Sequence, residues 1–474
     1  MGYVLNRLLP QVLNLTINMM KYLRNRTTII ALGVLLMLLA GCEKYLEVKP
    51  DKKIATPERL SDLDGMLDYY GQLNARYPQA AEINADNYYL NDAGWASSSE
   101  LHQNYYLWKK YDDNPADWNF PYENIYVSNV ILETLPKINY PTAETLKANQ
   151  IKGGALLLRS YFYLALLQLF APVYNEATAT SDLGIPIRQS SEVNDVSVRA
   201  TVKENYDQII QSLKQAIPLL PALPNASYKH RASKAAAYGT LARTYLIMQK
   251  YREAGVYADS CLQLNSTLMD YNAISTTSTI PFKQFNEEVI YDTRTTAPSA
   301  LAQTRAKVDE LLYQSYHVND LRRVVFFRAN TDGSKAFKGN YTGLSTAAMF
   351  TGIAIDEMYL IRAEAYARDG KKDLALTDLN TLLVKRFKTG TYTAVTALDA
   401  QDALDLVLKE RRKELVFRTL RWADLRRLNK EARYRVSLNR TINGVAHELK
   451  YDSERYTLQI SADVINRAGM PQNP

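Results

Sequence analysis

Apolar residues recur at helical spacing in five long segments of the chain, and segments that alternate apolar and polar residues are few. A period of three to four residues is typical of amphipathic helices that turn one face toward a core. The segments span 155–170, 202–220, 233–264, 357–387 and 403–428. The pattern therefore predicts an all-α fold.

Two of these segments resemble each other at a fixed offset of 121 residues. The matching positions are Tyr238, Ala242, Tyr245 and Ala254 in the first segment and Tyr359, Ala363, Tyr366 and Ala375 in the second. Small residues let two antiparallel helices approach closely, and aromatic residues fill the space to the next pair. This is the tetratricopeptide pattern, so we expect a helical repeat scaffold. Cys261 falls at a position where the repeat uses a small core residue, which predicts a buried thiol.

Two long stretches, 86–119 and 265–351, show no clear periodicity. They are rich in Asn, Ser, Thr, Gly and aromatic residues. Irregular insertions of this length in a compact domain usually carry function or contain small elements of their own. We therefore expect a binding site on these insertions.

The front of the chain has the pattern of a secretory signal. A basic segment, 21–26, precedes thirteen mostly apolar residues, 27–39. As a helix these would span roughly 20 Å, short of the ~30 Å hydrocarbon core of a membrane. We interpret residues 1–41 as a signal peptide whose true start is Met20, and 42–50 as a tether. The sequence Leu-Ala-Gly-Cys at 39–42 resembles the bacterial lipobox and predicts lipid attachment at Cys42.

Composition narrows the class of protein. The chain has 474 residues, 47% hydrophobic and 23% charged, as in ordinary globular proteins. Four basic residues lie in the signal, so the formal charge of +7 falls to 7 − 4 = +3 after cleavage. The most basic stretch, 409–440, interleaves acidic residues, which indicates salt-bridged helices and argues against nucleic-acid binding.

Motifs for catalysis or metal binding are not evident in the sequence. The four histidines are scattered at His102, His230, His317 and His447 without metal-ligand spacing, so we expect no metal, no cofactor and no catalytic residues. The adjacent carboxylates Glu287 and Glu288 are interpreted as solvated or capping groups. The Arg and Trp residues of 421–427, on a helix with acidic neighbours, predict a buried ion-paired framework.

Several separated segments, in order, are similar to those of one known family. They are Trp118, Tyr122, Ile125 and Asn129 at W-x3-Y-x2-I-x3-N spacing, 155–162 (ALLLRSYF), 231–237 (RASKAAA), 286–291 (NEEVIY), 320–322 (DLR), 410–417 (ERRKELVF), 421–427 (RWADLRR) and the terminal 472–474 (QNP). With these segments the chain resembles the SusD/RagB family of outer-membrane nutrient-binding lipoproteins. It departs from the family pattern at Arg418, at Ala423 and at 459–461.

The resemblance implies a tetratricopeptide-like scaffold with SusD-like regions at 51–265 and 266–474, lipid-anchored in the outer membrane and facing the exterior. It implies a SusC-like TonB-dependent barrel as partner and a ligand, most often a glycan, held on the irregular side. A sugar ring needs flat aromatic faces and planar polar groups. The candidate ligand-binding residues are Asp86, Asn87, Tyr88, Tyr89, Trp95, Tyr105 and Tyr106 in the first insertion and Phe337 and Tyr341 in the second. Trp95 is the leading candidate because the segment around it has no helical apolar pattern.

Two other classes of function remain open from the sequence. A tetratricopeptide scaffold can bind proteins alone. A secreted glycosidase would need two carboxylates that meet in space rather than in sequence. The nutrient could also be a peptide.

Overall fold

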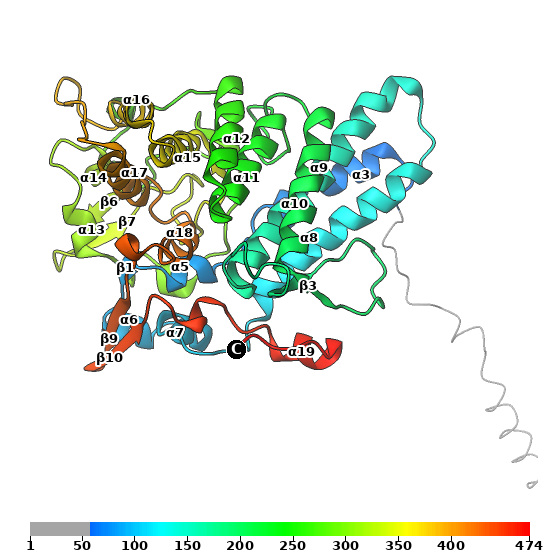
Figure 1. Cartoon of the computed structure of the whole chain (residues 1–474), viewed down its shortest axis with the longest axis horizontal. Coiled ribbons are helices and arrows are strands. Elements are labelled where there is room, and N and C mark those ends of the chain that lie inside the picture. Colours follow the sequence, from blue (N-terminus) through cyan, green and yellow to red (C-terminus); the bar gives the residue numbers. More distant parts are fainter. Residues whose placement is uncertain (1–56) are drawn as a thin grey trace, which may run out of the picture. The chain divides into compact units, whose positions relative to one another are not determined.

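The computed structural model describes residues 57–474, so the predicted signal, Cys42 and the tether lie outside the described part. Regular structure within that part is mostly helical (Figure 1). The first ten helices are α3 (Leu60–Leu67), α4 (Tyr70–Leu73), α5 (Ala80–Asn84), α6 (Asp92–Ala96), α7 (Glu100–Tyr106), α8 (Pro115–Thr134), α9 (Thr145–Phe170), α10 (Val202–Ala216), α11 (Lys234–Ile247) and α12 (Tyr251–Leu264). They are followed by α13 (Glu310–Gln314), α14 (Arg322–Val325), α15 (Ile355–Arg368), α16 (Lys372–Leu383), α17 (Ala400–Glu414), α18 (Arg421–Leu428) and α19 (Ala462–Ala468).

The strands are short and pair only in twos, all antiparallel. The pairs are β1 (Tyr88–Tyr89) with β5 (Lys307–Val308), β2 (Leu183–Pro186) with β3 (Arg199–Thr201), β4 (Val289–Tyr291) with β8 (Ile353–Ala354), β6 (Phe327–Ala329) with β7 (Lys335–Phe337), and β9 (Leu438–Ile442) with β10 (Val445–Leu449). Three pairs join neighbouring segments of the chain, whereas β1–β5 and β4–β8 join segments far apart in the sequence, and no pair extends into a layer. The mostly helical fold predicted from the sequence is confirmed.

Long helices pack against their neighbours in a continuous series. α8 contacts α9, α9 contacts α10, α10 contacts α11, α11 contacts α12, α12 contacts α15, and α15 contacts both α16 and α17. Figure 1 shows this series running across the molecule, with α6, α7, the β9–β10 hairpin and α19 along one edge. One apolar core extends from α8 to α15 and includes residues from both sides of position 265, and two smaller clusters hold the buried residues of α16 and α17.

The predicted repeat is confirmed. The bounds of α11 differ from those of α15 by 121 residues, and α12 begins 121 residues before α16. Ala242 and Ala363 are fully buried at the centres of the two first helices. A Cβ on Gly255 of α12 would come within 2.6 Å of the Ala365 Cβ on α15, so the two repeats approach as closely as small residues permit. Cys261 is buried and its thiol donates to the Ala235 carbonyl, as expected of a core residue.

Side-chain caps begin several of these helices. Thr201 and Glu204 form a reciprocal capping box on α10, Ser233 Oγ accepts from the Ala236 N–H on α11, and Asp399 accepts from the Asp402 N–H on α17. These caps satisfy backbone donors that the first turn of a helix leaves free. Local sequence therefore determines where these helices begin.

Helix α9 lies at the centre of the fold. Among the described residues, the segment Thr142–Phe170 is long and apolar enough to cross a membrane, and its most apolar window is entirely buried inside the protein. A helix that is apolar on all sides and covered by its neighbours is a core helix.

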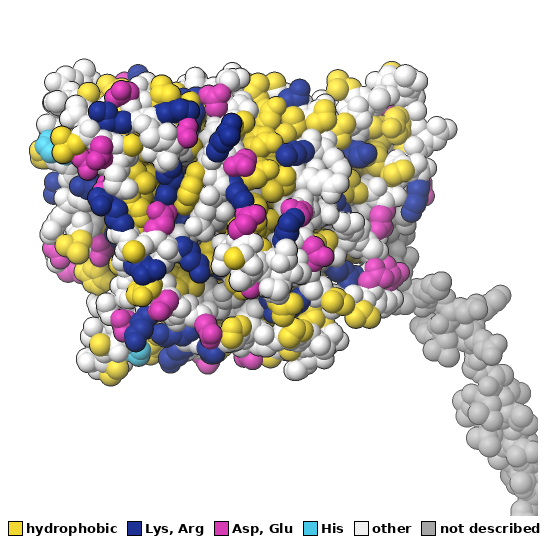
Figure 2. Space-filling model, viewed as in Figure 1, with side chains coloured by type: hydrophobic (Ala, Val, Ile, Leu, Met, Phe, Trp, Pro, Cys, Tyr) yellow, Lys and Arg dark blue, Asp and Glu magenta, His cyan; other side chains and the backbone are white. Residues whose placement is uncertain are grey.

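Charged side chains of both signs are interspersed on the face seen in Figure 2. Hydrophobic atoms gather over the middle of this face, where α11 and α12 lie in Figure 1. The rings of Tyr245 on α11 and Tyr257 on α12 stack with their centroids 5.5 Å apart. This surface belongs to the repeat helices.

Candidate functional site

The first insertion, 86–119, contains α6, α7 and the start of α8, so it is more ordered than its lack of periodicity indicated. Asn91 Oδ1 accepts from the Gly94 N–H and caps α6, while Ser99 Oγ accepts from the His102 N–H and caps α7. Both helices are too short to show a helical apolar pattern. The capping residues Asn91 and Ser99 were the signal in the sequence from which the starts of these two helices could have been predicted.

Trp95 lies on α6 and is half-buried. Its indole Nε1 donates to the Gln103 carbonyl at 3.2 Å, and part of the ring packs on the core. The rest of the ring remains accessible. Gln103 also donates from its side chain to the carbonyls of Ala96 and Ser98, so the turn that carries Trp95 is held from both sides.

Segments that are distant in the sequence contact residues on both sides of Trp95 in the chain. Arg305 donates from Nε to Ser97 Oγ at 2.8 Å and from Nη1 to the Ser299 carbonyl. The Asn443 N–H, in the Asn-Gly turn of the β9–β10 hairpin, donates to Asp92 Oδ1 at 2.7 Å. We call residues 89–99, 299–307 and Asn443 the Trp95 surface.

Tyr89 is the most exposed of the predicted aromatic residues, with 42% of its surface accessible. It lies in β1 opposite Lys307 of β5, and Lys307 pairs with Asp332 at 3.1 Å. Burial, and secondarily the charge of Asp332, raise the pKa of the Tyr89 hydroxyl. The 305–307 segment therefore contacts both the strand that carries Tyr89 and the residues next to Trp95, and Tyr89 is exposed while Trp95 is partly exposed.

The structure corrects the prediction for three tyrosines of the first insertion, which are buried. Tyr88 donates to the Ile83 carbonyl, and Tyr106 accepts from the Leu90 N–H. The Arg440 guanidinium lies 3.9 Å from the Tyr106 ring centroid and 5.6 Å from that of Tyr88. Tyr105 is likewise buried. These rings fill the core beneath the Trp95 surface and are not accessible to a ligand.

Phe337 and Tyr341 of the second insertion are also buried, which corrects their assignment as exposed ligand-binding residues. Phe337 stacks on Phe417 with ring centroids 4.6 Å apart. Tyr341 donates to Glu288 at 2.7 Å inside a network of charges.

Asp86 and Asn87 have structural partners. Arg421 binds both carboxylate oxygens of Asp86, at 2.6 and 2.9 Å, and Arg412 lies at 3.2 Å. Burial by itself raises the pKa of the Asp86 carboxyl, but the two arginines hold it below its usual range. Asn87 is buried and donates to Glu82. Both side chains are therefore bound by groups of the protein itself.

The buried ion-paired framework predicted for 421–427 is confirmed. Arg427 pairs with Glu364 and with Asp424, and Arg411 also pairs with Asp424. All four side chains are buried. The conspicuous arginines therefore stabilise α18 against α15 and α17.

Three buried carboxylates, Glu288, Asp356 and Glu414, have oxygen atoms within 4.8 Å of one another. Arg386 donates to both Glu288 and Glu414 at 2.8 Å, and Arg418 pairs with Asp356 at 2.7 Å. Guanidinium groups supply the positive charge that a metal ion would otherwise supply, so this cluster belongs to the framework. The interpretation of Glu288 as solvated or capping is wrong, because its charge partners come from segments far along the chain.

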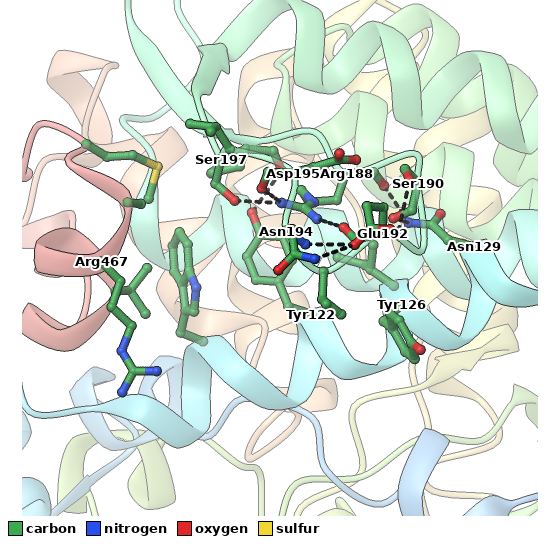
Figure 3. A pocket seen from close by; sticks show the side chains of 18 residues that line it. Tyr122, Tyr126, Asn129, Arg188, Ser190, Glu192, Asn194, Asp195, Ser197 and Arg467 are labelled. Atoms are coloured by element: carbon green, nitrogen blue, oxygen red, sulfur yellow. Dashed lines mark hydrogen bonds between the residues drawn. The ribbon is translucent and has the colours of Figure 1, made fainter. Parts of the chain in front are cut away.

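A groove that the sequence did not predict lies between α8, the loop 186–197 and α19 (Figure 3). Its volume is about 500 Å³, within the range of ligand pockets. Its lining includes Trp118, Tyr122, Tyr126, Arg188, Glu192, Asn194, Asp195, Val464 and Arg467. Trp118, Tyr122 and Tyr126 are four residues apart on one helix, a spacing that puts them on one face.

The loop that forms one wall of the groove is attached firmly at its base. Tyr122 donates to the Pro186 carbonyl at 2.8 Å, and Asn129 donates to the carbonyls of Arg188 and Ser190. Arg188 then folds under the tip of the loop and donates to Ser197 Oγ and to the carbonyls of residues 192 and 195. The loop is preorganised by one guanidinium group.

Comparison with known proteins identifies the relatives of this chain. The family model described as "Starch-binding associating with outer membrane" matches residues 44–246, and the model described as "SusD family" matches residues 323–474. A curated relative, SusD-like protein P38 from Formosa agariphila, is 21% identical over 505 residues, covering 90% of this chain and 95% of the relative.

Solved structures share the fold. A SusD superfamily protein from Bacteroides vulgatus superposes with a TM-score of 0.73 at 21% identity, over 88% of this chain and 99% of that one. A laminarin-binding SusD-like protein superposes with a TM-score of 0.63 at 18% identity, over 87% and 97% of the two chains. The two family models lie in order at the two ends of the described helical body, and with the shared fold they lead to one conclusion: the chain belongs to the SusD/RagB family.

Proposed function

We propose that this protein binds an oligosaccharide on the Trp95 surface and delivers it to a TonB-dependent barrel in the outer membrane. The observation that carries the proposal is the geometry of Trp95, a partly exposed indole ring that packs on the core and whose Nε1 donates to the Gln103 carbonyl. A ring held in one orientation loses little entropy when a ligand stacks on it. Binding without catalysis is sufficient for this role.

The chemistry of the Trp95 surface suits a sugar. Aromatic faces at Trp95 and Tyr89 can cover the C–H face of a pyranose ring, because large apolar rings with a polar edge favour such mixed ligands. Arg305, Lys307 and Asp332 add planar or charged hydrogen-bonding groups around these rings. A peptide is the alternative ligand, and would need backbone donors and acceptors along an extended edge.

Attachment to the membrane and the barrel partner are supported by the family and by the leader. The family description associates its members with the outer membrane. The lipobox-like sequence ending at Cys42 supplies a lipid anchor, which would face the exterior in this role. The repeat helices, with the stacked Tyr245 and Tyr257, offer a surface for the barrel.

The test is a titration of the soluble protein, residues 43–474, with maltooligosaccharides and laminarin oligosaccharides by calorimetry. Loss of one well-placed aromatic contact costs at least about 2 kcal/mol, so Trp95→Ala should weaken binding roughly thirtyfold. Trp95→Phe should retain part of the affinity. Thermal melting of the same samples serves as the folding control.

Two results would count against the proposal. Wild-type affinity in a stable Trp95→Ala protein would remove Trp95 from the site. A drop in stability of roughly 3 to 5 kcal/mol, with binding lost only through unfolding, would make Trp95 a core residue.

A further inference from the structure

We infer that the groove between α8, the 186–197 loop and α19 is a second carbohydrate-binding site, separate from the Trp95 surface. The ligand class rests on the proposed function, whereas the location rests on the geometry of the groove alone. The residues that line the groove and those that form the Trp95 surface are different sets, contributed by different elements.

One wall of the groove is aromatic. Trp118, Tyr122 and Tyr126 follow one another at intervals of four residues on α8, a rise of roughly 6 Å per interval. The ring centroids of Trp118 and Tyr122 are 5.0 Å apart. Accessibility increases along the row, from 5% at Trp118 to 42% at Tyr126. Trp118 is a core residue that packs behind Tyr122, so the rings offered to the groove are those of Tyr122 and Tyr126. Two successive rings on one face of a helix suit a sugar chain that lies along it.

The opposite wall is polar and held in place. Glu192, Asn194 and Asp195 are exposed on the tip of the loop, and the backbone around them is bound by Arg188. Glu192 Oε1 accepts from both nitrogen atoms of Asn194, which orients the amide and leaves its carbonyl oxygen available (Figure 3). Carboxylate and amide groups in fixed positions are the side chains that bind sugar hydroxyls.

Helix α19 closes the third side with an apolar and a cationic group. Val464 and Arg467 line the groove from this helix. The Arg467 guanidinium is mostly exposed and pairs with Asp463 at 2.8 Å, one turn earlier on the same helix. An exposed pair of this kind is weak, so the guanidinium can exchange this partner for a ligand hydroxyl.

The carboxylates at the tip of the loop favour a carbohydrate over a purely apolar ligand. The exposed Val193 and Val196 lie beside the polar tip, and could by themselves favour an apolar ligand. Such a ligand would also cover the carboxylates of Glu192 and Asp195 without offering them hydrogen bonds, and removing charged groups from water in this way is costly. A carbohydrate satisfies both walls because it presents C–H faces to the rings and hydroxyls to the loop.

The experiment compares Tyr126→Ala and Asp195→Asn with the wild-type protein. Both side chains are exposed, and Asp195 contacts Arg188 through its backbone carbonyl, which the substitution leaves intact. Each protein is titrated with maltoheptaose and with laminarin oligosaccharides, and hydrogen exchange is measured with and without the sugar. Tyr69→Ala removes an exposed tyrosine elsewhere and is the matched control.

We expect two sites per wild-type protein for a short sugar, one of which weakens roughly tenfold or more in Tyr126→Ala while the other is retained. Hydrogen exchange in residues 186–197 should slow when the sugar binds.

Sugar binding that is unchanged in both groove variants, with no protection of the loop, overturns the second site and leaves the Trp95 proposal intact. Loss of affinity in the groove variants, with none in Trp95→Ala, removes the Trp95 surface instead. If an apolar fluorescent probe binds to the groove and none of the sugars does, the carbohydrate assignment is wrong.

Discussion

Glu82 is a fully buried carboxylate beneath the Trp95 surface. It accepts from Asn87 Nδ2 at 2.8 Å and from the Thr419 N–H at 2.7 Å. Burial raises the pKa of its carboxyl to about 7 in spite of these two hydrogen bonds. Because the folded protein favours the protonated form of this carboxyl group, its contribution to stability is fully present below the pKa of the unfolded chain. That contribution is lost as the pH rises through about 7, where the buried group must ionise.

Removing the charge at position 82 should therefore matter most at high pH. Glu82→Gln should raise the free energy of unfolding relative to wild type at pH 8, by an amount approaching ~3 kcal/mol, and much less at pH 5. The oxygen of the new amide can keep the hydrogen bond from the Thr419 N–H, and its nitrogen can donate to Asn87 Oδ1 once the Asn87 amide turns over, because that oxygen has no protein partner among residues 57–474. Urea unfolding at the two pH values measures the difference. Glu287→Gln removes the same charge from an exposed position as a control, and a pH-independent difference at position 82 would contradict the assignment.

At the scale of the element, small residues determine how closely the repeat helices approach. Ala242 of α11 is fully buried, and Gly255 of α12 lies against Ala365 of α15. Interiors packed at this density have no room for additional methylene groups. The same argument explains why Cys261 is a core residue and not a reactive thiol; burial raises its pKa, so the thiolate is disfavoured.

Ala242→Leu should therefore lower the free energy of unfolding by roughly 1 to 3 kcal/mol through overpacking. The measurement is chemical denaturation monitored by circular dichroism. Ala143→Leu places the same side chain at an exposed turn before α9 and should have little effect. An unchanged midpoint in the Ala242 variant would contradict the close helix pairing.

At the scale of the whole molecule, the fold depends on packing, and the proposed attachment to the membrane depends on one residue. Once Cys42 is acylated, Cys261 has no partner for a disulfide, so the buried core and the arginine–carboxylate framework stabilise the body. The lipid on Cys42, which lies outside the described residues, would attach that body to the membrane.

Cys42→Ala should release the protein from the membrane fraction or leave it uncleaved, because the acylated sulfur is the anchor. Cell fractionation with detergent partitioning tests this. Cys261→Ala removes the other, buried thiol and should remain in the membrane fraction. A Cys42→Ala protein that still partitions as an acylated protein would show that the lipobox assignment is wrong.

The sequence alone was sufficient for the five long helical segments, the repeat at an offset of 121, the burial of Cys261 and the ion-paired 421–427 segment. These depend on periodicity and on neighbours close in the chain, which the order of residues states directly. It was not sufficient for the predicted ligand residues, most of which are core, because exposure depends on which distant segment covers a side chain. Tyr106 is covered by Arg440, Tyr341 binds Glu288, and Tyr126 is left open by the path of the 186–197 loop. Only the tertiary structure decided these contacts, since each joins residues whose separation along the chain carries no periodic signal.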